Sequence, residues 1–351
     1  MRRINNAVAA GLAGAVLLAG WALHGQPANP PSSQAESFVF RSDTRVVVCN
    51  TTVFDKNGHL VTDLARDAFT VTENGAAQRI TEFRREDVPV SLGLIVDNSG
   101  SMRIKRAGVE AASLALVKDS NPQDEVFVVN FNDEAFLDLP NRKDFTNDIR
   151  EMEEALTRID ARGGTAMRDA IRMSIDHLNE KAHRDKKVLV VVTDGVDNES
   201  LITQEKMIKA AQQSGVLIYA VGLLEDEDRG DASKARRELT ALAEATGGET
   251  YFPKEVSDVE SIAHLVAHDI RSQYTIQYTP SNAAMDGTFR QIKVAVNAPG
   301  HLTARTRNGY YATPDQGIKP GKLNAFRCAS RPFPVGHALA CPRSAHSPGF
   351  G

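Results

Sequence analysis

Hydrophobic and polar residues alternate in short runs between about residues 38 and 86. The runs are separated by turn signals at Asp55-Lys56-Asn57-Gly58 and Glu73-Asn74-Gly75. An apolar period of two that is bounded by such turns predicts short β-strands. We place these strands at residues 45–48, 51–54, 68–73 and 79–84. The segment is therefore predicted to be a small β module.

From residue 89 onward, continuous apolar runs alternate with amphipathic segments. The runs predict buried strands at residues 91–96, 125–131, 187–193 and 216–223, and a short strand at 249–252. The amphipathic segments predict helices at residues 103–118, 145–159, 167–181, 204–214, 233–246 and 258–271. In the first helix, Ile104, Gly108, Ala111 and Ala115 keep one face small and apolar. This alternation predicts an α/β fold: a doubly wound, Rossmann-like, mostly parallel sheet covered on both faces.

Beyond residue 272 the apolar period returns to two, at residues 274–278, 290–296 and 301–305. These strands need neighbours, and the N-terminal β module can supply them. The α/β part would then be inserted in a small β-sandwich. The tyrosines Tyr274, Tyr278, Tyr310 and Tyr311 are expected to pack on the strand faces of this sandwich.

The two ends of the chain have the composition of an export signal and of unstructured segments. Met1-Arg2-Arg3 precedes an apolar run over residues 7–23, which predicts a secretory signal and leaves an uncleaved N-terminal membrane anchor open. The protein is thus expected to be secreted, or to lie in the periplasm or cell envelope. The predicted divisions are 1–25 signal or anchor, 26–37 linker, 38–88 β module, 89–272 α/β domain, 273–312 returning strands and 313–351 disordered tail.

Charge and cysteine content narrow the classes of function. The chain has 351 residues, and 41 basic against 45 acidic side chains give a net charge of -4, which argues against a nucleic-acid partner. The spacing of Cys49, Cys328 and Cys341 fits no zinc motif. A bridge between Cys328 and Cys341 stays open, and Cys49 is expected to be a small buried apolar residue.

Candidate chemistry gathers where predicted strands end. Asp97-Asn98-Ser99-Gly100-Ser101 follows the strand at 91–96, Thr193-Asp194-Gly195 ends the strand at 187–193, and Gly163-Gly164-Thr165 opens the helix at 167–181. In a parallel sheet, ligand sites lie beyond the carboxyl ends of the strands. The few carboxylates and neutral hydroxyls of Asp97, Ser99, Ser101, Thr165 and Asp194 suit Mg²⁺, Ca²⁺ or Mn²⁺.

In chain order and spacing, these five residues closely resemble the metal-ion-dependent adhesion site (MIDAS) of von Willebrand factor type A domains. The resemblance covers about residues 88–271, including Asp124-Glu125-Val126 and Ala245-Thr246-Gly247-Gly248. It implies a six-stranded sheet with one antiparallel edge strand and a metal at its top. The flanking β segments look like those of secreted bacterial proteins of the same broad family. The implied function is metal-dependent protein binding or adhesion, in which an acidic side chain of a protein partner completes the metal's coordination.

These and other residues also fit alternative interpretations. Taken alone, Asp97 and Ser99 would favour a helix N-cap. Asp97 could also be the nucleophile of an aspartyl-phosphate enzyme, but no other motif in the sequence supports that chemistry. No catalytic residue is therefore predicted. Asp197 and Asn198 could support the metal ligands or form a second cation site, but a solvated turn is favoured. Arg229-Gly230-Asp231 is expected in a charged loop. The alternative function is that of an envelope assembly or scaffold factor whose metal is purely structural.

Overall fold

The computed structural model describes residues 45–313, except residues 86 and 159. The predicted export signal, the linker, the tail after residue 313 and the Cys328–Cys341 pair lie outside these residues. Among the residues that are described, no helix is long and apolar enough to cross a membrane.

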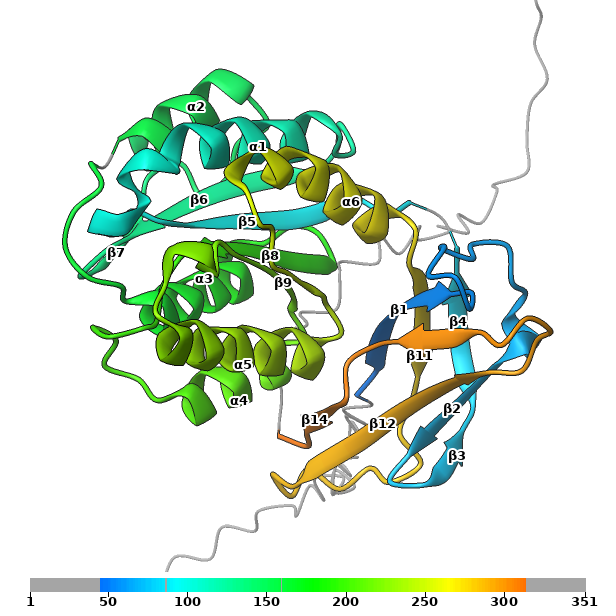
Figure 1. The fold of residues 1–351 in the computed structure, drawn as a ribbon. Helices are drawn as coiled ribbons and strands as arrows, with labels where there is room; N and C mark the ends of the chain where they lie inside the picture. The colour runs from blue at the N-terminus through cyan, green and yellow to red at the C-terminus, as the bar shows by residue number, and fades with distance from the viewer. Residues whose placement is uncertain (1–44, 86, 159, 314–351) are drawn as a thin grey trace, which may run out of the picture. The chain divides into compact units, whose positions relative to one another are not determined.

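A six-stranded sheet in the order β10-β9-β8-β5-β6-β7 forms the centre of the α/β part (Figure 1). All neighbouring strands are parallel except β7, which runs antiparallel to β6 at the edge. This confirms the predicted fold class and the antiparallel edge strand. The strands are β5 (Val90–Asp97), β6 (Glu125–Phe131), β7 (Ala135–Leu137), β8 (Lys186–Thr193), β9 (Leu217–Gly222) and β10 (Thr250–Tyr251).

Helices cover both faces of this sheet, with α1, α2 and α6 on one side and α3, α4 and α5 on the other (Figure 1). The α-helices are α1 (Arg106–Lys118), α2 (Ile149–Thr157), α3 (Met167–Lys181), α4 (Gln204–Ser214), α5 (Arg229–Thr246) and α6 (Val259–Arg271). Short 3-10 helices are η1 (Arg66–Ala68), η2 (Gly100–Ile104), η3 (Pro140–Arg142), η4 (Leu224–Asp226) and η5 (Val256–Asp258).

Two four-stranded sheets, β13-β1-β11-β4 and β14-β12-β2-β3, combine strands from before and after the α/β part. Their facing side chains form a core of their own, which includes Cys49 and the rings of Tyr274, Tyr278 and Tyr310. The strands are β1 (Val47–Phe54), β2 (Phe69–Glu73), β3 (Ala76–Gln78), β4 (Ile80–Arg84), β11 (Tyr274–Tyr278), β12 (Phe289–Val296), β13 (Thr303–Arg305) and β14 (Gly309–Tyr311).

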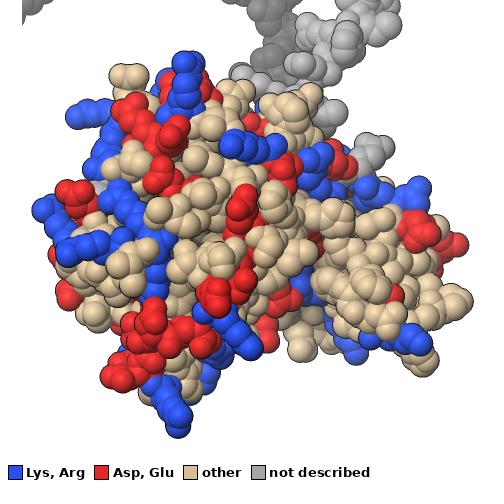
Figure 2. All heavy atoms as spheres, turned by 45° about the horizontal axis from the view of Figure 1, so that its top comes forward, with Lys and Arg blue, Asp and Glu red and all other residues tan. Residues whose placement is uncertain are grey.

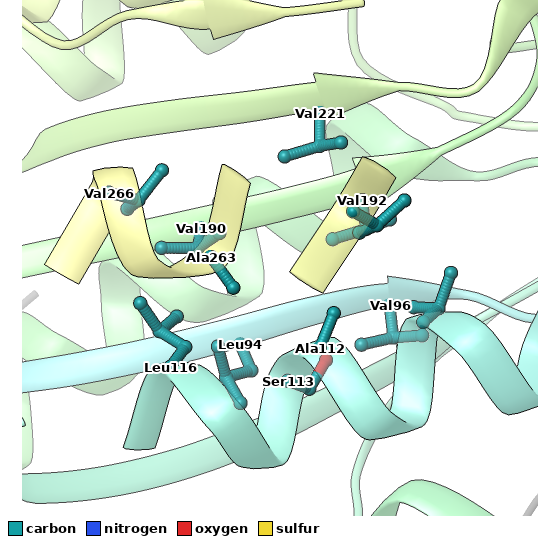
Figure 3. A pocket seen from close by; sticks show the side chains of 12 residues that line it. Leu94, Val96, Ala112, Ser113, Leu116, Val190, Val192, Val221, Ala263 and Val266 are labelled. Carbon is teal, nitrogen blue, oxygen red and sulfur yellow. The ribbon is translucent and has the colours of Figure 1, made fainter. Parts of the chain in front are cut away.

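The centre of the α/β part is tightly packed. Every residue of β5 is buried, and Gly93 is required in it because a Cβ there would lie 2.4 Å from the ring of Phe127. Between α1, α6 and the sheet lies a cavity of about 20 Å³, lined by valine, leucine and alanine side chains and by Ser113 (Figure 3). A space of that size holds at most one water molecule, so it is a packing defect and not a ligand site.

The structure corrects three local predictions. The strands predicted at 45–48 and 51–54 are one continuous strand, β1, because Cys49 and Asn50 both pair with β11. Helix α5 begins at Arg229, so Arg229-Gly230-Asp231 forms its first turn and is not in a loop. The short strands β3, β7 and β14 were not predicted, because three residues are too few to show a period.

The apolar face predicted for the first helix is correct at Ala115, which is buried, but wrong at Ile104 and Ala111. Ile104 is 86% exposed and Ala111 is exposed, whereas Val109, Ala112 and Leu116 are buried. The segment begins with the 3-10 turn η2 and enters the α-helix only at Arg106. A 3-10 turn has about 3.0 residues per turn instead of 3.6, so the face shifts along the chain. The shift turns Lys105 inward, where it is 5% exposed.

Candidate metal centre

The loop after β5 places a carboxylate and two hydroxyls at the carboxyl edge of the sheet. Asp97 is the last residue of β5 and is 1% exposed. Its Oδ1 accepts the backbone N–H of Ser99 at 2.7 Å, and its Oδ2 accepts the hydroxyl of Thr193 at 2.6 Å. These contacts fix the turn in which Ser99 and Ser101 follow the strand, with their Oγ atoms 3.1 Å apart.

The loop after β8 brings the second carboxylate to the same place. Asp194 is fully buried, and its Oδ1 accepts the hydroxyl of Ser101 at 2.8 Å. Because that hydroxyl has a single proton, the bond between the two serines is donated by Ser99. Three oxygen-bearing side chains from the loops after two neighbouring strands, β5 and β8, therefore form one continuous chain of polar contacts.

Thr165 lies on a third loop beside the other two. A Cβ on Gly195, the residue after Asp194, would be 3.8 Å from the Thr165 Oγ1. The Gly100 N–H donates to the carbonyl of Gly163 at 3.2 Å, which joins this loop to the one after β5. The structure thus brings Ser99, Ser101 and Asp194 into direct contact, with Asp97 behind the serine loop and Thr165 against the residue that follows Asp194.

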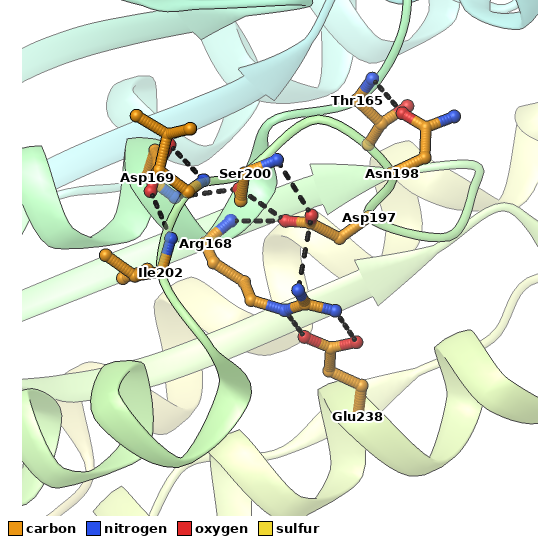
Figure 4. Close-up of polar contacts among 9 residues, drawn as sticks. Thr165, Arg168, Asp169, Asp197, Asn198, Ser200, Ile202 and Glu238 are labelled. Carbon is orange, nitrogen blue, oxygen red and sulfur yellow. Dashed lines mark hydrogen bonds and ion pairs between the residues drawn. The ribbon is translucent and has the colours of Figure 1, made fainter.

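Asp197 and Asn198 support the Thr165 loop (Figure 4). The side-chain oxygen of Asn198 accepts the Thr165 N–H at 2.9 Å, and the Thr165 carbonyl accepts the Asn198 N–H at 3.1 Å. Asp197 is 5% exposed, accepts the Arg168 N–H at 2.7 Å and forms an ion pair with the Arg168 guanidinium at 3.5 Å. The same guanidinium binds both carboxylate oxygens of Glu238. The favoured solvated turn is therefore wrong for Asp197, which is buried, whereas Asn198 is exposed, and the contact of Asn198 with Thr165 agrees with a supporting role behind the ligands.

The chemistry of the donor set fits a hard divalent cation. Burial raises the pKa of Asp97 to about 6, against the hydrogen bonds from Thr193 and Ser99, which lower it. A carboxylate whose charged form is destabilised by burial gains from a cation placed beside it. Among the described residues, no cluster of three or more His, Cys, Asp or Glu side chains is placed to hold a metal. A site here would depend on the serine and threonine hydroxyls, which are ligands for Mg²⁺, Ca²⁺ and Mn²⁺.

Comparison with known proteins identifies the α/β part. The sequence model of the von Willebrand factor type A domain matches residues 92–268, just over half of the chain. The chain belongs to the von Willebrand factor type A domain family. The resemblance predicted from the five residues of the metal centre is thereby confirmed at the level of the family.

Individual relatives of this type A domain chain are distant. Inter-alpha-trypsin inhibitor heavy chain H4 of Bos taurus is 23% identical over 72% of this chain and 27% of that protein. An uncharacterized protein of Borreliella burgdorferi is 23% identical over half of each chain. The chain spans about a quarter to a half of the length of these two relatives. A solved von Willebrand factor type A structure from Catenulispora acidiphila has a TM-score of 0.47 and 16% identity, and covers 79% of this chain and 76% of its own.

One charged residue of the type A domain's site was missed by sequence reasoning. Lys105 donates from Nζ to the Oδ2 of Asp194 at 2.9 Å. The pKa of Lys105 is raised: burial lowers it, but Asp194 and Asp226 outweigh that effect. The inward position of Lys105 follows from the 3-10 turn before α1, which periodicity cannot resolve because it spans only five residues.

Proposed function

We propose that this type A domain binds a divalent cation, Mg²⁺, Ca²⁺ or Mn²⁺, through Asp97, Ser99, Ser101, Thr165 and Asp194, and through the cation binds an acidic side chain of a protein partner. The observation that carries the proposal is the contact chain from Ser99 Oγ to Ser101 Oγ at 3.1 Å and on to Asp194 Oδ1 at 2.8 Å. It joins hydroxyls and a carboxylate from two loops at the edge where a parallel sheet binds its ligands.

Each residue has a distinct part in this proposal. Ser99 and Ser101 offer neutral oxygens, and Asp194 offers the Oδ1 that now accepts the Ser101 hydroxyl. Asp97 holds the serine loop through the Ser99 N–H, so it acts as a ligand or as the support of the ligands. A bound dication would supply an electrophilic centre, because only two carboxylates neutralise it. An acidic side chain from outside could then replace a water molecule.

The mixed charge of the molecule is consistent with a protein partner. Figure 2 shows basic and acidic side chains interspersed over one face of the molecule, a pattern that does not favour a polyanion there. Ser101, the middle member of the contact chain, is exposed, whereas Asp97, Ser99 and Asp194 are buried, so the chain reaches solvent at Ser101. We propose an exported protein whose type A domain binds its partner outside the cytoplasm, and we propose no catalytic role.

Calorimetric titration of the full chain with MgCl₂ and MnCl₂ tests the metal site. Wild-type protein should bind one dication, and a hundredfold excess over the Kd should stabilise the fold by about 2.7 kcal/mol. Asp97→Asn preserves shape and should abolish binding while the chain stays folded. Asp176→Asn, on the exposed side of α3, is the matched control and should bind as wild type does. Equal binding by Asp97→Asn and wild type would overturn the proposed site.

A pull-down from envelope extract tests the role of the metal. Partner capture should require Mg²⁺ or Mn²⁺ and should be lost with EDTA and with Asp97→Asn. Capture that persists undiminished in EDTA, by a protein that does bind metal, would support the alternative of an assembly or scaffold factor with a structural metal.

A further inference from the structure

Lys105 joins the candidate metal centre to the loop after β9. It stands between η2 and α1, and only 5% of the residue is exposed. Its Nζ lies 2.9 Å from Asp194 Oδ2, 3.1 Å from Asp226 Oδ2 and 3.4 Å from the carbonyl oxygen of Leu223. An ammonium group has three protons to donate, and three oxygens surround it here.

The two carboxylate oxygens of Asp194 have different kinds of partner. Its Oδ1 accepts the Ser101 hydroxyl at the metal centre, and its Oδ2 accepts the Lys105 ammonium on the opposite side. The Asp194 side chain is fully buried, and a buried carboxylate is strongly destabilising unless a positive charge compensates it. Lys105 supplies that charge from within the chain, while Oδ1 stays on the side of the hydroxyls.

This arrangement changes the charge that a metal would meet. Asp97 and Asp194 together carry two negative charges, and the Lys105 ammonium in contact with Asp194 offsets one of them. Asp226, the other acid that touches Lys105, has a side chain that is 72% exposed, so water screens it. A dication bound beside Asp97 and Asp194 would retain a net positive charge, which attracts an anionic ligand.

We propose that Lys105 is a built-in counter-cation for Asp194, a proposal that rests on the proposed function. It keeps the site folded when no metal is bound, it lowers the affinity of the site for the metal, and it raises the affinity of the bound metal for an external carboxylate. Lys105 is thus a positioning and charge-setting residue of the site and not a ligand of the metal.

Lys105→Met in the full chain tests all three effects. The melting temperature in EDTA should fall, because Asp194 is left buried without a counter-charge, and Mn²⁺ should restore it. Calorimetry should show Mn²⁺ binding about tenfold more tightly than to wild type, because one nearby positive charge is gone. Acetate, used as the simplest carboxylate and followed by water-proton relaxation of the Mn²⁺-loaded protein, should bind more weakly. Lys118→Met, exposed at the end of the same helix, is the matched control and should behave as wild type.

Asp226→Asn provides a second test that leaves the buried pair intact. Its side chain is largely exposed, so folding is not at risk, and Lys105 would keep Asp194 as its one carboxylate partner. Mn²⁺ should then bind about two- to threefold more weakly than to wild type, the size expected for an exposed charge.

The outcomes separate this inference from the proposed function. If Lys105→Met loses melting temperature in EDTA but binds Mn²⁺ as wild type does, Lys105 is only a structural ion-pair partner and the inference is overturned. If wild type and both variants bind no Mn²⁺, the proposed function fails and the inference fails with it. Tighter Mn²⁺ binding together with weaker acetate binding by Lys105→Met would establish the counter-cation.

Discussion

Two buried aspartates of the α/β part, Asp194 and Asp269, are built into opposite kinds of environment. Asp194, at the carboxyl edge of the sheet, accepts one hydroxyl and one ammonium, and the hydroxyl belongs to the exposed Ser101. Asp269, in α6, accepts the hydroxyls of Thr52 and Tyr219, each at 2.8 Å, and forms an ion pair with Arg305 of β13. The first carboxylate opens toward solvent through its hydroxyl partner, and the second is enclosed.

The difference shows how the same residue types serve binding in one place and cohesion in another. At Asp269 the hydroxyls come from a β1 threonine and a β9 tyrosine that are both fully buried, and Gln273 donates to both of them. Three segments far apart in sequence are thereby held together. At the metal centre the two serine hydroxyls lie two residues apart on one tight turn beside Asp194, and their oxygen atoms are available to an external cation.

The largest effect is expected for Asp269→Asn. The substitution keeps the shape but leaves the Arg305 guanidinium without its buried carboxylate, although Glu249 remains beside it. Breaking a buried ion pair costs about 3 kcal/mol of unfolding free energy or more. Urea denaturation should show this loss, while the Mn²⁺ affinity should stay unchanged. Glu260→Gln, exposed on the same helix, should change stability by less than about 0.5 kcal/mol. A fall in Mn²⁺ affinity in Asp269→Asn would show that the surroundings of Asp269 and the metal centre at Asp194 are coupled, and would contradict their separate roles.

The sheet, and the meeting of Asp97 and Asp194 at its carboxyl edge, could be predicted because both depend on apolar runs that are visible in the sequence. The buried strand ending in Asp97 and the one ending before Asp194 are continuous apolar runs, and the rule for parallel sheets places their ends together. Helices α3 and α4 were predicted with their observed bounds, because α3 has a clear apolar period and α4 has Thr203 and Gly215 at its ends.

The partners of the charged groups could not be predicted in the same way. The pairing of Asp269 with Arg305 depends on how β13 packs against β1 and leaves no mark on the hydrophobic period. Lys105 was missed for a local reason, since the turn η2 moves it to the inner face that periodicity had assigned to Ile104. Polar contacts across a fold are specified by three-dimensional packing, and a single sequence shows only which residues are available for them.

The next-largest effect is expected at Lys186, at the start of β8, where a substitution should increase the stability of the fold instead of decreasing it. Burial lowers the pKa of Lys186 to about 8, and its Nζ donates to the carbonyl of Ile270 in the same helix as Asp269. The charged amine is therefore a cost to folding at neutral pH. Lys186→Met should raise the free energy of unfolding at pH 7 by about 2 kcal/mol. This is less than the free energy that corresponds to the whole pKa shift, because the substitution also removes the hydrogen bond to the Ile270 carbonyl.

The pH dependence gives a sharper test of the same group. Between pH 8 and about 10.4, the unfolded chain binds the Lys186 proton more tightly than the folded chain does, so wild-type stability should rise with pH in that window. Below pH 8 the lysine is charged in both states and its contribution is constant. The advantage of Lys186→Met should thus shrink from pH 8 to pH 10. Lys181→Met, which is exposed, should show no such trend. If the difference in unfolding free energy between Lys186→Met and wild type stayed constant across this range, the lowered pKa of Lys186 would be contradicted.

The smallest effect is expected for Asn198→Ala, which loosens the Thr165 loop of the candidate metal centre without removing a proposed ligand. Asn198 accepts the Thr165 N–H at 2.9 Å through its side chain, so its loss frees the loop that carries the Thr165 hydroxyl. Stability should fall by about 1 kcal/mol, the value of one hydrogen bond, and Mn²⁺ affinity should fall about tenfold, as for groups that orient metal ligands. Asn297→Ala removes one side-chain hydrogen bond to Thr70 in the β-sandwich and should leave Mn²⁺ affinity unchanged. Equal Mn²⁺ affinity in Asn198→Ala and wild type would mean that Thr165 contributes nothing to the metal centre, because a ligand whose loop has lost its support cannot keep its full contribution to binding.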